Sequence, residues 1–449
     1  MTGEAMEVRD ASPGYAPQVG MPVVPEGYKQ TEVGVIPEDW LVSTLAELNP
    51  FVTSGSRGWA SYYAQFGDLF VRITNMSRES VHLDLSDSRF VSIPELGQEG
   101  ARTSLKLGDF LVSITADIGI ISFVDEAVPL PAYINQHIAL VRIPADVVCS
   151  KFVALFLSFG QGQKRFRAIT DQGAKAGINL KTVREVPLAL PPSLAEQRAI
   201  TTALSDVDAL LEALDRLIAK KRDIKQATMQ QLLTAQTRLP GFEGEWGIYR
   251  LDEIAEIRSG GTPSTAKVEF WNGGIPWCTP TDITALGGRK YLSTTERNIS
   301  DAGLRSSSAE VIPPRSIIMT TRATIGECAI NTVPMTTNQG FKNLVPASVD
   351  YEYLYYLMTT QKERLTQLCA GSTFLEIGKR QLARFNIYLP QDVKEQRAIA
   401  TVLADMDAEL EALQQRRTKT TALKQAMMQE LLTGRTRLVG LQVGAEAGE

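Results

Sequence analysis

Apolar side chains recur at alternating intervals of four and three residues in a stretch before the middle of the chain. They are Ile200, Leu204, Val207, Leu211, Leu214 and Ile218. This spacing places them on one stripe of a helix, the pattern of a coiled-coil seam. No glycine or proline interrupts the stretch where the register shifts near Lys221. The pattern therefore predicts one amphipathic helix of about 40 residues, roughly 60 Å long.

A second copy of this stretch begins 199 residues later. Residues 190–241 align with 389–440 without a gap and are identical at 29 of 52 positions. The second seam reads Ile399, Leu403, Met406, Leu410 and Leu413, and then meets Arg417. Such self-similarity indicates an internal duplication, and two seams in one chain most simply pack against each other. Two unrelated surface helices remain the alternative.

Both copies carry helix-start signals. Ser193 and Glu196 stand at the N-cap and third helical positions of the first copy, and Asp392 and Glu395 stand there in the second. This arrangement predicts a capping box at each start. Gly434 is expected to end the second helix.

The blocks that precede the two helices also correspond, although weakly. Residues 107–120 align with 313–327, and 133–144 align with 336–347. Short β-branched runs between Gly and Pro turns predict a mixed sheet with a few helices in each block. The predicted fold class is α+β: two similar mixed α/β domains, separated and joined by two long antiparallel coiled-coil helices with pseudo-two-fold symmetry. The predicted segments are a disordered tail 1–23, a first domain 24–189, a central helix 190–240, a second domain 241–388, a C-terminal helix 389–436 and a tail 437–449.

Composition narrows the class of protein. The chain has 449 residues, 44% of them hydrophobic, no apolar run long enough for a bilayer and no export signal at its start, so a cytoplasmic location is expected. Its four cysteines are widely spaced, which predicts free thiols and no metal site. The net charge is −5, but residues 40–184 and 246–383 each carry +1. Near-neutral domains permit basic faces without demonstrating them.

Catalytic motifs are missing from the sequence. The Pro-Pro pairs at 191–192 and 313–314 lack the preceding Asn or Asp and the following aromatic residue of DNA amino-methyltransferases. No phosphate-binding loop with its lysine is present, and two histidines support no Ser/His/Asp set. The sequence therefore predicts a chain that binds and organises, with no catalytic residue of its own.

Several motifs together resemble the DNA-specificity (S) subunit of type I restriction-modification systems. VPEGYKQTEVGVIPEDW at 24–40 is similar to that family's usual leading sequence, and SGGTPSTAKVEFWNGGIPWCTPTDI at 259–283 is similar to the start of a target-recognition domain. TTRATIG and TNQGF resemble the middle of such a domain, and the duplicated EQRAI helices resemble its two spacer helices. The resemblance covers nearly all of the chain from about residue 24.

The resemblance implies a role in host defence. Two target-recognition domains each read one half of a bipartite, asymmetric double-stranded DNA target. The paired helices hold the domains at a fixed distance and dock two methyltransferase (M) subunits. These M subunits bind S-adenosylmethionine and methylate adenine N6, while restriction (R) subunits that use ATP and Mg join for cleavage. The chain itself is expected to bind no cofactor, and the ten seam residues named above, from Ile200 to Leu214 and from Ile399 to Leu413, are the predicted spacer and docking positions.

Cations and amides are the candidate DNA contacts, because phosphates attract Lys and Arg while amide and guanidinium groups pair with base edges. In the first domain they are Lys164, Arg165, Arg167, Lys175, Lys181, Asn135 and Gln136. In the second domain they are Arg322, Asn338, Gln339, Lys342, Ser372, Thr373, Lys379 and Arg380. A solvated helix face is the alternative for 160–181, and Asn-Gln pairs in turns also bond their own backbone. His137 fits either a DNA contact or packing.

Two other functions remain open at this point. One is a fused or orphan specificity protein acting without restriction; a fused methyltransferase-specificity chain would need a cofactor fold and the Pro-Pro-aromatic motif, which the sequence lacks. A coiled-coil scaffold that does not bind DNA is compatible with the near-neutral domains.

Overall fold

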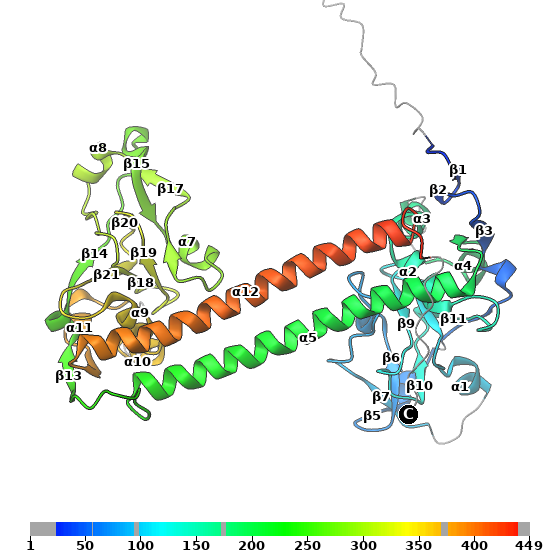
Figure 1. Cartoon of the computed structure of the whole chain (residues 1–449), viewed down its shortest axis with the longest axis horizontal. Helices are drawn as coiled ribbons and strands as arrows, with labels where there is room; N and C mark the ends of the chain where they lie inside the picture. Colours follow the sequence, from blue (N-terminus) through cyan, green and yellow to red (C-terminus); the bar gives the residue numbers. More distant parts are fainter. Residues whose placement is uncertain (1–23, 56, 94–97, 172–176, 370–375, 439–449) are drawn as a thin grey trace, which may run out of the picture. The chain divides into compact units, whose positions relative to one another are not determined.

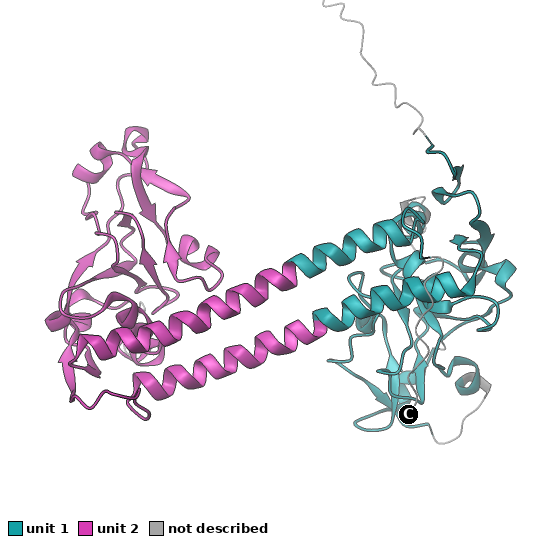
Figure 2. Cartoon of the chain, viewed as in Figure 1, with its two compact units in different colours: residues 1–211, 419–449 teal, residues 212–418 magenta. Residues whose placement is uncertain are grey.

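The computed structural model describes residues 24–55, 57–93, 98–171, 177–369 and 376–438. The chain divides into two compact units, shown in Figures 1 and 2: unit 1 is residues 1–211 with 419–449, and unit 2 is residues 212–418. The division passes through both long helices, so each unit contains part of each helix. The predicted tail 1–23 and most of the tail 437–449 lie outside the described residues.

Two long helices dominate the chain, as the 4-3 spacing predicted. They are α5 (Leu194–Leu233) and α12 (Val393–Leu431), of 40 and 39 residues. Gly434 follows α12 with a φ of 70°, a left-handed conformation that suits glycine at a helix end. The register shift near Lys221 does not interrupt α5.

Unit 1 contains a four-stranded antiparallel sheet and a second mixed sheet. The first has the order β4 (Phe51–Ser54), β11 (Ile138–Arg142), β8 (Phe110–Ser113), β9 (Ile121–Phe123). The second has the order β10 (Ala132–Ile134), β6 (Asp68–Val71), β7 (Phe90–Val91), β5 (Tyr63–Ala64). Two-stranded pairs join β12 (Pro187–Leu190) to β3 (Leu41–Thr44) and β1 (Tyr28–Thr31) to β2 (Gly34–Pro37). The shorter helices are α1 (Gln98–Thr103), α2 (Ser150–Ser158), α3 (Gly160–Asp171) and α4 (Leu180–Arg184).

Unit 2 repeats the main sheet with one added strand. Its order is β14 (Ala255–Ser259), β21 (Phe341–Pro346), β18 (Ile317–Thr320), β19 (Cys328–Asn331), β16 (Tyr291–Leu292). A smaller sheet has the order β17 (Arg297–Ile299), β15 (Trp271–Cys278), β20 (Thr336–Thr337), and β13 (Trp246–Arg250) pairs with β22 (Asn386–Pro390). The helices are α6 (Leu251–Ile254), α7 (Pro280–Ala285), α8 (Asp301–Arg305), α9 (Tyr351–Thr359), α10 (Lys362–Gln367) and α11 (Lys379–Ala383).

The two units therefore share a topology. The order β4-β11-β8-β9 recurs as β14-β21-β18-β19. In both units the strand that is second in this order, β11 or β21, is followed along the chain by a helix, α2 or α9. This recurrence agrees with the weak correspondence of the preceding blocks and with a mixed α/β fold built twice.

Each unit packs the ends of both long helices into the core of its domain. In unit 1 the buried cluster joins Leu204 of α5 and Leu431 of α12 to the domain's Trp40, and in unit 2 it joins Leu403 and Leu232 to Tyr353. The helix ends are thus part of each domain's core. The cysteines are free thiols, as predicted, and burial raises the pKa of Cys278 and Cys328.

Candidate nucleic-acid interface

The same turn follows the central strand of both main sheets. After β8, Ser113 Oγ accepts a hydrogen bond from Ile120 N at 2.8 Å. After β18, Thr320 Oγ1 accepts one from Glu327 N at 3.1 Å. The turns place Ala116 and Ala323 at φ values of 60° and 56°. A left-handed alanine costs about 1–2 kcal/mol, and strain of this kind is typical of binding sites.

A second turn, which contains the Asn-Gln pair, lies beside the first one in each unit. Asn135 Oδ1 accepts a hydrogen bond from His137 N at 3.1 Å, and Asn338 Oδ1 accepts one from Gly340 N at 2.9 Å. The alternative that these asparagines bond their own backbone is therefore confirmed. A Cβ on Gly260 would lie 1.8 Å from Asn338 O, so only glycine permits this close approach.

The neighbouring side chains in unit 1 form a polar chain. His137 Nδ1 lies 2.5 Å from Thr115 Oγ1, and His137 Nε2 lies 3.1 Å from Gln136 Nε2. His137 therefore bonds two half-exposed polar neighbours. Position 115 in the first turn corresponds to Arg322 in unit 2, because both stand four residues before the closing glycine of the turn. The two domains carry different polar groups on one backbone frame.

In unit 2 the turn gathers opposite charges. Arg322 Nη2 lies 2.7 Å from Glu376 Oε2, and 45% of the Arg322 side chain is exposed. Lys342 Nζ lies 3.9 Å from Glu376 Oε1, but this side chain is only 9% exposed. Burial lowers the pKa of Lys342, with Glu376 opposing that effect. As a DNA contact, Lys342 stays a prediction; its side chain is largely buried, whereas Arg322 beside it is half-exposed.

The basic segment of unit 1 forms α3, and this helix packs against the first turn. Gln163 Nε2 donates to Gly119 O at 2.6 Å. Lys164, Arg165 and Arg167 are exposed on α3, with Arg165 4.0 Å from Glu32. Lys164, Arg165 and Arg167 therefore lie on a helix that rests on the turn.

The other predicted contacts are more dispersed. Lys181 is exposed at α4 and lies 3.6 Å from Glu185, and Lys379 and Arg380 are exposed at the start of α11. Gln339 accepts a hydrogen bond from the Thr262 hydroxyl. Three further predicted contacts lie outside the described residues: Lys175, Ser372 and Thr373. As DNA contacts, all of these residues stay predictions.

Sequence analysis did not predict one residue that lies between α3 and the first turn, Arg78. Arg78 donates to Gln163 Oε1 at 2.5 Å and to Ile118 O at 2.8 Å, and it also pairs with Asp117. It therefore joins α3 to the first turn, and its partners Asp117 and Gln163 lie 39 and 85 residues away in the sequence. No local pattern marks an arginine that acts at such a separation.

The glutamates of the duplicated EQR motifs fasten the helix starts. The Glu196 carboxylate accepts hydrogen bonds from Arg437 Nε at 2.6 Å and Nη2 at 2.8 Å. The Glu395 carboxylate accepts them from Arg238 Nε at 2.9 Å and Nη2 at 2.7 Å. Each arginine follows the end of the other long helix, and 238 and 437 differ by the same 199 residues as the glutamates. Asp39 also pairs with Arg437, at 2.8 Å.

The capping-box prediction is correct in its first half at Ser193 only, because Asp392 caps the second helical residue and not the third. Ser193 Oγ accepts from Glu196 N at 3.1 Å, and Asp392 Oδ1 accepts from Lys394 N at 2.8 Å. The glutamate side chains do not return to the N-cap, because the arginines bind both of their oxygens. A bidentate charged pair is stronger than a single cap bond.

The adjacent glutamines anchor the same helix starts to their domains. Gln197 accepts from Cys149 N at 2.9 Å and donates to Pro191 O at 3.0 Å. Gln396 accepts from Asp350 N at 2.8 Å and donates to Pro390 O at 2.8 Å. In each unit, the Glu and Gln of the EQR stretch therefore attach the start of a long helix to other residues of that unit.

The predicted seam residues face inward. Six are buried: Ile200, Leu204, Leu214, Ile399, Leu403 and Leu410. Four are half-buried: Val207, Leu211, Met406 and Leu413. Arg417, which interrupts the second seam, pairs with Asp215 at 2.5 Å. None of the ten side chains is exposed, so these residues contribute to packing inside the protein.

A repeated ion pair also joins the long helices within each unit. In unit 1 Lys424 Nζ lies 2.6 Å from Asp208 Oδ1, and in unit 2 Lys225 pairs with Asp407. Each aspartate reaches its domain as well, since Asp407 accepts from Tyr356 Oη at 2.6 Å. The pairs keep the two helices in register inside each unit.

Asp208 makes its domain contact with a histidine. His82 Nδ1 lies 2.6 Å from Asp125 Oδ2, and His82 Nε2 lies 3.8 Å from Asp208 Oδ2. Hydrogen bonding to Asp125 and then to Asp208 raises the pKa of His82 to about 9, although burial and Lys151 oppose this. His82 is therefore protonated near neutral pH and attracts both carboxylates.

Replacing His82 by glutamine is expected to destabilise unit 1 by about 1–2 kcal/mol at pH 6.5 and below. The folded pKa lies above the usual 6.5, so this stabilisation is complete below pH 6.5 and is lost as pH rises through about 9. Urea unfolding at about pH 6 and about pH 9.5 measures it. A difference between wild type and variant that stays constant across this range would contradict the role of His82.

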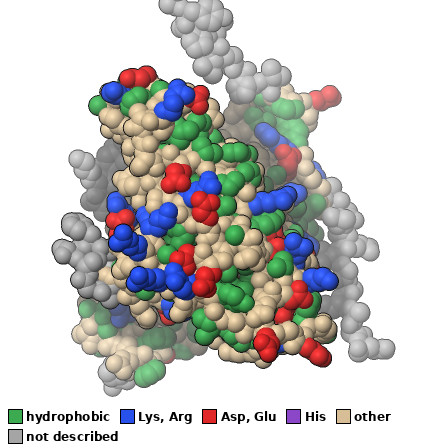
Figure 3. All heavy atoms as spheres, turned by 90° about the vertical axis from the view of Figure 1, so that its left-hand side faces the viewer, with side chains coloured by type: hydrophobic (Ala, Val, Ile, Leu, Met, Phe, Trp, Pro, Cys, Tyr) green, Lys and Arg blue, Asp and Glu red, His purple; other side chains and the backbone are tan. Residues whose placement is uncertain are grey.

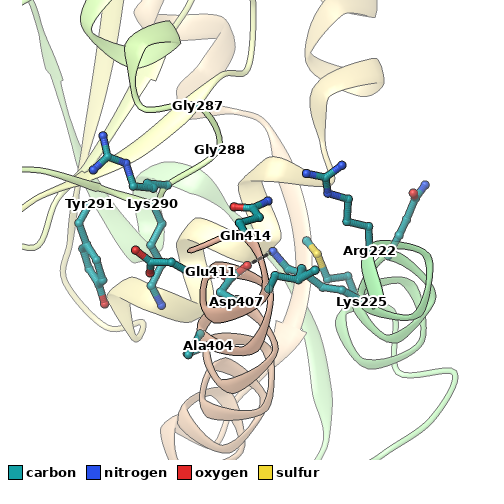
Figure 4. A pocket seen from close by; sticks show the side chains of 15 residues that line it. Arg222, Lys225, Gly287, Gly288, Lys290, Tyr291, Ala404, Asp407, Glu411 and Gln414 are labelled. Carbon is teal, nitrogen blue, oxygen red and sulfur yellow. Dashed lines mark hydrogen bonds and ion pairs between the residues drawn. The ribbon is translucent and has the colours of Figure 1, made fainter. Parts of the chain in front are cut away.

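Unit 2 also contains an open cleft of about 700 Å³, shown in Figure 4. Arg222 and Lys225 of α5 line one side, Gly287 to Tyr291 line another, and Asp407 and Glu411 of α12 lie between them. The Lys225–Asp407 ion pair lies at this cleft. Its mixed charges fit a polar partner, and within the described residues no group of His, Cys, Asp and Glu is arranged to hold a metal ion.

The surface of unit 2 carries charges of both signs. Figure 3 shows Lys and Arg side chains interspersed with Asp and Glu on the face that it presents. This face is not a uniform basic surface, which agrees with the near-neutral charge of the block.

The repeated sheet topology and the matching turns show that the chain is built by internal duplication. A sequence model described as the type I restriction modification DNA specificity domain matches residues 84–220 and 243–420. The chain belongs to this family. Among the described helices, none is long and apolar enough to cross a membrane.

Individual relatives agree with this assignment. The type I restriction enzyme MjaIX specificity subunit of Methanocaldococcus jannaschii is 41% identical over 175 residues, which cover 38% of this chain and 40% of that protein. A protein of the same organism assigned as the MjaX specificity subunit is 23% identical over 431 residues, 92% of this chain and 97% of that protein.

Solved structures show the same fold. The S subunit of a type I system from M. genitalium matches with a TM-score of 0.53 and 14% identity, over 87% of this chain and 96% of that one. A chain from a study of assembly and conformational transition in a type I R-M system matches with a TM-score of 0.53 and 19% identity, over 89% and 99%.

Proposed function

We propose that this chain is the sequence-reading subunit of a type I restriction-modification complex. Each domain reads one half of a bipartite, asymmetric DNA target through its paired turns. The observation that carries this proposal is one turn built twice with a different side chain at the same place, Thr115 in unit 1 and Arg322 in unit 2. A shared frame with different reading groups suits two unequal half-sites.

The helices have a second role in this proposal. Paired antiparallel as a coiled coil with pseudo-two-fold symmetry, they set the gap between half-sites and dock two methyltransferase subunits. S-adenosylmethionine is then bound by those subunits, and ATP and Mg by restriction subunits, so the chain itself performs no catalysis. The inward seam supports a structural role for the helices.

Co-expression with a type I methyltransferase subunit from the same genome tests the proposal. Sequencing of methylated sites should return one bipartite target with two different halves. The purified chain alone, incubated with labelled S-adenosylmethionine and DNA, should transfer no methyl group. Transfer by the chain alone would refute the division of labour, and a complex without methylation sites would favour a scaffold that does not read DNA.

Inserting four residues into both α5 and α12, between Leu214 and Ile224 and between Leu413 and Leu423, is expected to lengthen the unread gap by one or two base pairs. Four helical residues add about 6 Å, and base pairs are spaced about 3.4 Å apart. Both helices must change together, because after an insertion in one helix the pairs Asp208–Lys424 and Lys225–Asp407 could not form at the same time. Methylation-site sequencing measures the gap, and an unchanged gap would contradict the spacer role.

A further inference from the structure

An exposed arginine begins the edge strand of the smaller sheet in unit 2. Arg297 of β17 pairs with Trp277 of β15, and Trp277 pairs on its other side with Thr336 of β20. The chain passes from β20 directly into the turn that contains Asn338. Arg297 therefore belongs to the same sheet as one of the two turns of the candidate interface.

Unit 1 has an arginine at the equivalent place in its second sheet. Tyr133 of β10, which aligns with Thr336, pairs with Phe70 of β6. On the other side of Phe70, its backbone N donates to the carbonyl oxygen of Arg89 at 2.8 Å, immediately before β7. Arg89 therefore corresponds to Arg297, because each stands opposite the same position of the neighbouring strand.

The sequence around the two arginines supports this correspondence. RFVS at 89–92 and RNIS at 297–300 share the arginine, a β-branched apolar residue at the third position and the serine. The matching turns of the same two domains differ, with Thr115 in unit 1 and Arg322 in unit 2. The arginine has therefore stayed the same while the polar group at the matching turn has changed.

Packing within each domain does not account for the shared arginine. Arg89 and Arg297 are both exposed, and within the described ranges no ion pair involves either side chain. Exposed positions without a specific partner usually tolerate substitution. Retention of the same cation at both places is therefore best explained by a contact that both domains make outside the chain.

Two tryptophans hold Arg297 in one orientation. The guanidinium carbon lies 3.8 Å from the centre of the Trp271 ring and 5.2 Å from that of the Trp277 ring. Trp271 Nε1 donates to Ser264 O at 3.1 Å, and Trp277 Nε1 donates to Gly261 O at 2.9 Å, so both rings are fixed. A guanidinium over an aromatic face keeps the N–H donors at its rim available for an anion.

The anion must be one that both halves of the target present. Bases differ between two unequal half-sites, whereas the phosphate groups of the backbone are the same in both. An accessible guanidinium binds phosphate oxygens through charge-assisted hydrogen bonds, often two at once. A phosphate therefore fits a residue that is identical in two domains whose other polar groups have diverged.

We infer that Arg89 and Arg297 each bind one backbone phosphate of the DNA, one in each half-site. The inference rests on the proposed function, because it takes the chain to meet two half-sites. The two arginines fix the position of each domain along the duplex and contact no base edge. The turn that carries Thr115 or Arg322 is thereby held at a constant position relative to the bases.

The salt dependence of DNA binding tests this assignment in the complex of the full chain with its methyltransferase subunits. The probe is a fluorescent duplex that contains the methylated target, and anisotropy at a series of salt concentrations gives the slope of log K against log salt. Arg89→Ala and Arg297→Ala should each reduce the magnitude of this slope by about 0.9, the value for one phosphate contact. Binding should weaken about eightfold at about 0.1 M salt, and the methylated sequence should stay the same.

A third arginine provides the matched control. Arg384 of unit 2 is also exposed, but it follows α11 where Glu185 follows the equivalent helix α4 in unit 1. Arg384→Ala removes the same charge and should leave the slope unchanged. Arg89→Lys and Arg297→Lys keep a cation and should restore most of the slope, which a purely structural role of the arginine would not predict. Unchanged unfolding midpoints confirm that the variants are folded.

The outcomes separate this inference from the proposed function. An unchanged slope in both alanine variants, or an equal reduction by Arg384→Ala, would overturn the inference and leave the proposed function intact. An altered base preference in the methylated target would also overturn it, because the arginines would then read bases. Loss of methyltransferase subunits from the alanine variants would assign the arginines to a protein contact instead. A wild-type complex that binds no DNA would overturn both proposals.

Discussion

Arg437→Ala is expected to destabilise unit 1 by about 3 kcal/mol, because it removes the partner of a carboxylate that has almost no access to water. The Glu196 side chain is only 1% exposed and receives both donors of Arg437. Its loss leaves Glu196 buried and unpaired, and it frees Asp39 as well. The unfolding midpoint of unit 1 in urea measures the effect.

A neighbouring arginine provides the control for this prediction. Arg435 lies two residues earlier, keeps 59% of its side chain exposed and reaches Glu430 only at 3.9 Å. Arg435→Ala should cost no more than about 0.5 kcal/mol. The double variant Glu196→Gln/Arg437→Ala should be more stable than Arg437→Ala, since the buried charge is then absent. Equal losses from both single arginine variants would contradict a special role for Arg437.

Arg322→Ala is expected to relax sequence preference in one half of the methylated target and to leave the other half unchanged. An arginine that bonds a guanine at two points contributes about 1–3 kcal/mol of discrimination, so preference for the natural half-site should fall roughly 10- to 100-fold. Sequencing of methylated sites from cells that co-express the methyltransferase subunit gives both halves in one experiment.

Two variants sharpen this second prediction. Glu376→Gln removes the carboxylate that pairs with Arg322 at 2.7 Å and should preserve the preference or strengthen it. Arg322→Lys keeps the charge but not the two-point geometry, so it should retain affinity and lose discrimination. Relaxation in both halves, or in neither, would show that Arg322 does not read one half-site.

Much of the fold could be predicted from local pattern. The 4-3 spacing of Ile200 to Leu214 specifies a helical stripe whatever surrounds it, and α5 and α12 have the predicted lengths. The seam also faces inward, as hydrophobic burial requires. The predicted segment boundaries stay predictions, and the division into units runs through both helices.

The candidate site was harder to predict because its members meet across long separations. Arg322 was selected for its chemistry, and the structure leaves it accessible at a strained turn. Lys342 was selected for the same reason but is largely buried, because both faces of β21 are covered from Phe341 to Leu344. Arg78 was missed altogether, since its partners Asp117 and Gln163 are distant in sequence.

The duplicated stretch shows where the two kinds of information divide. The sequence alone determined that two equivalent helices exist, how long they are and which side of each is apolar, because spacing along a helix maps directly onto its faces. Only the tertiary structure decided that Glu196 and Glu395 bind arginines 241 and 157 residues away. Such pairings depend on how the chain returns through space, which no local periodicity encodes.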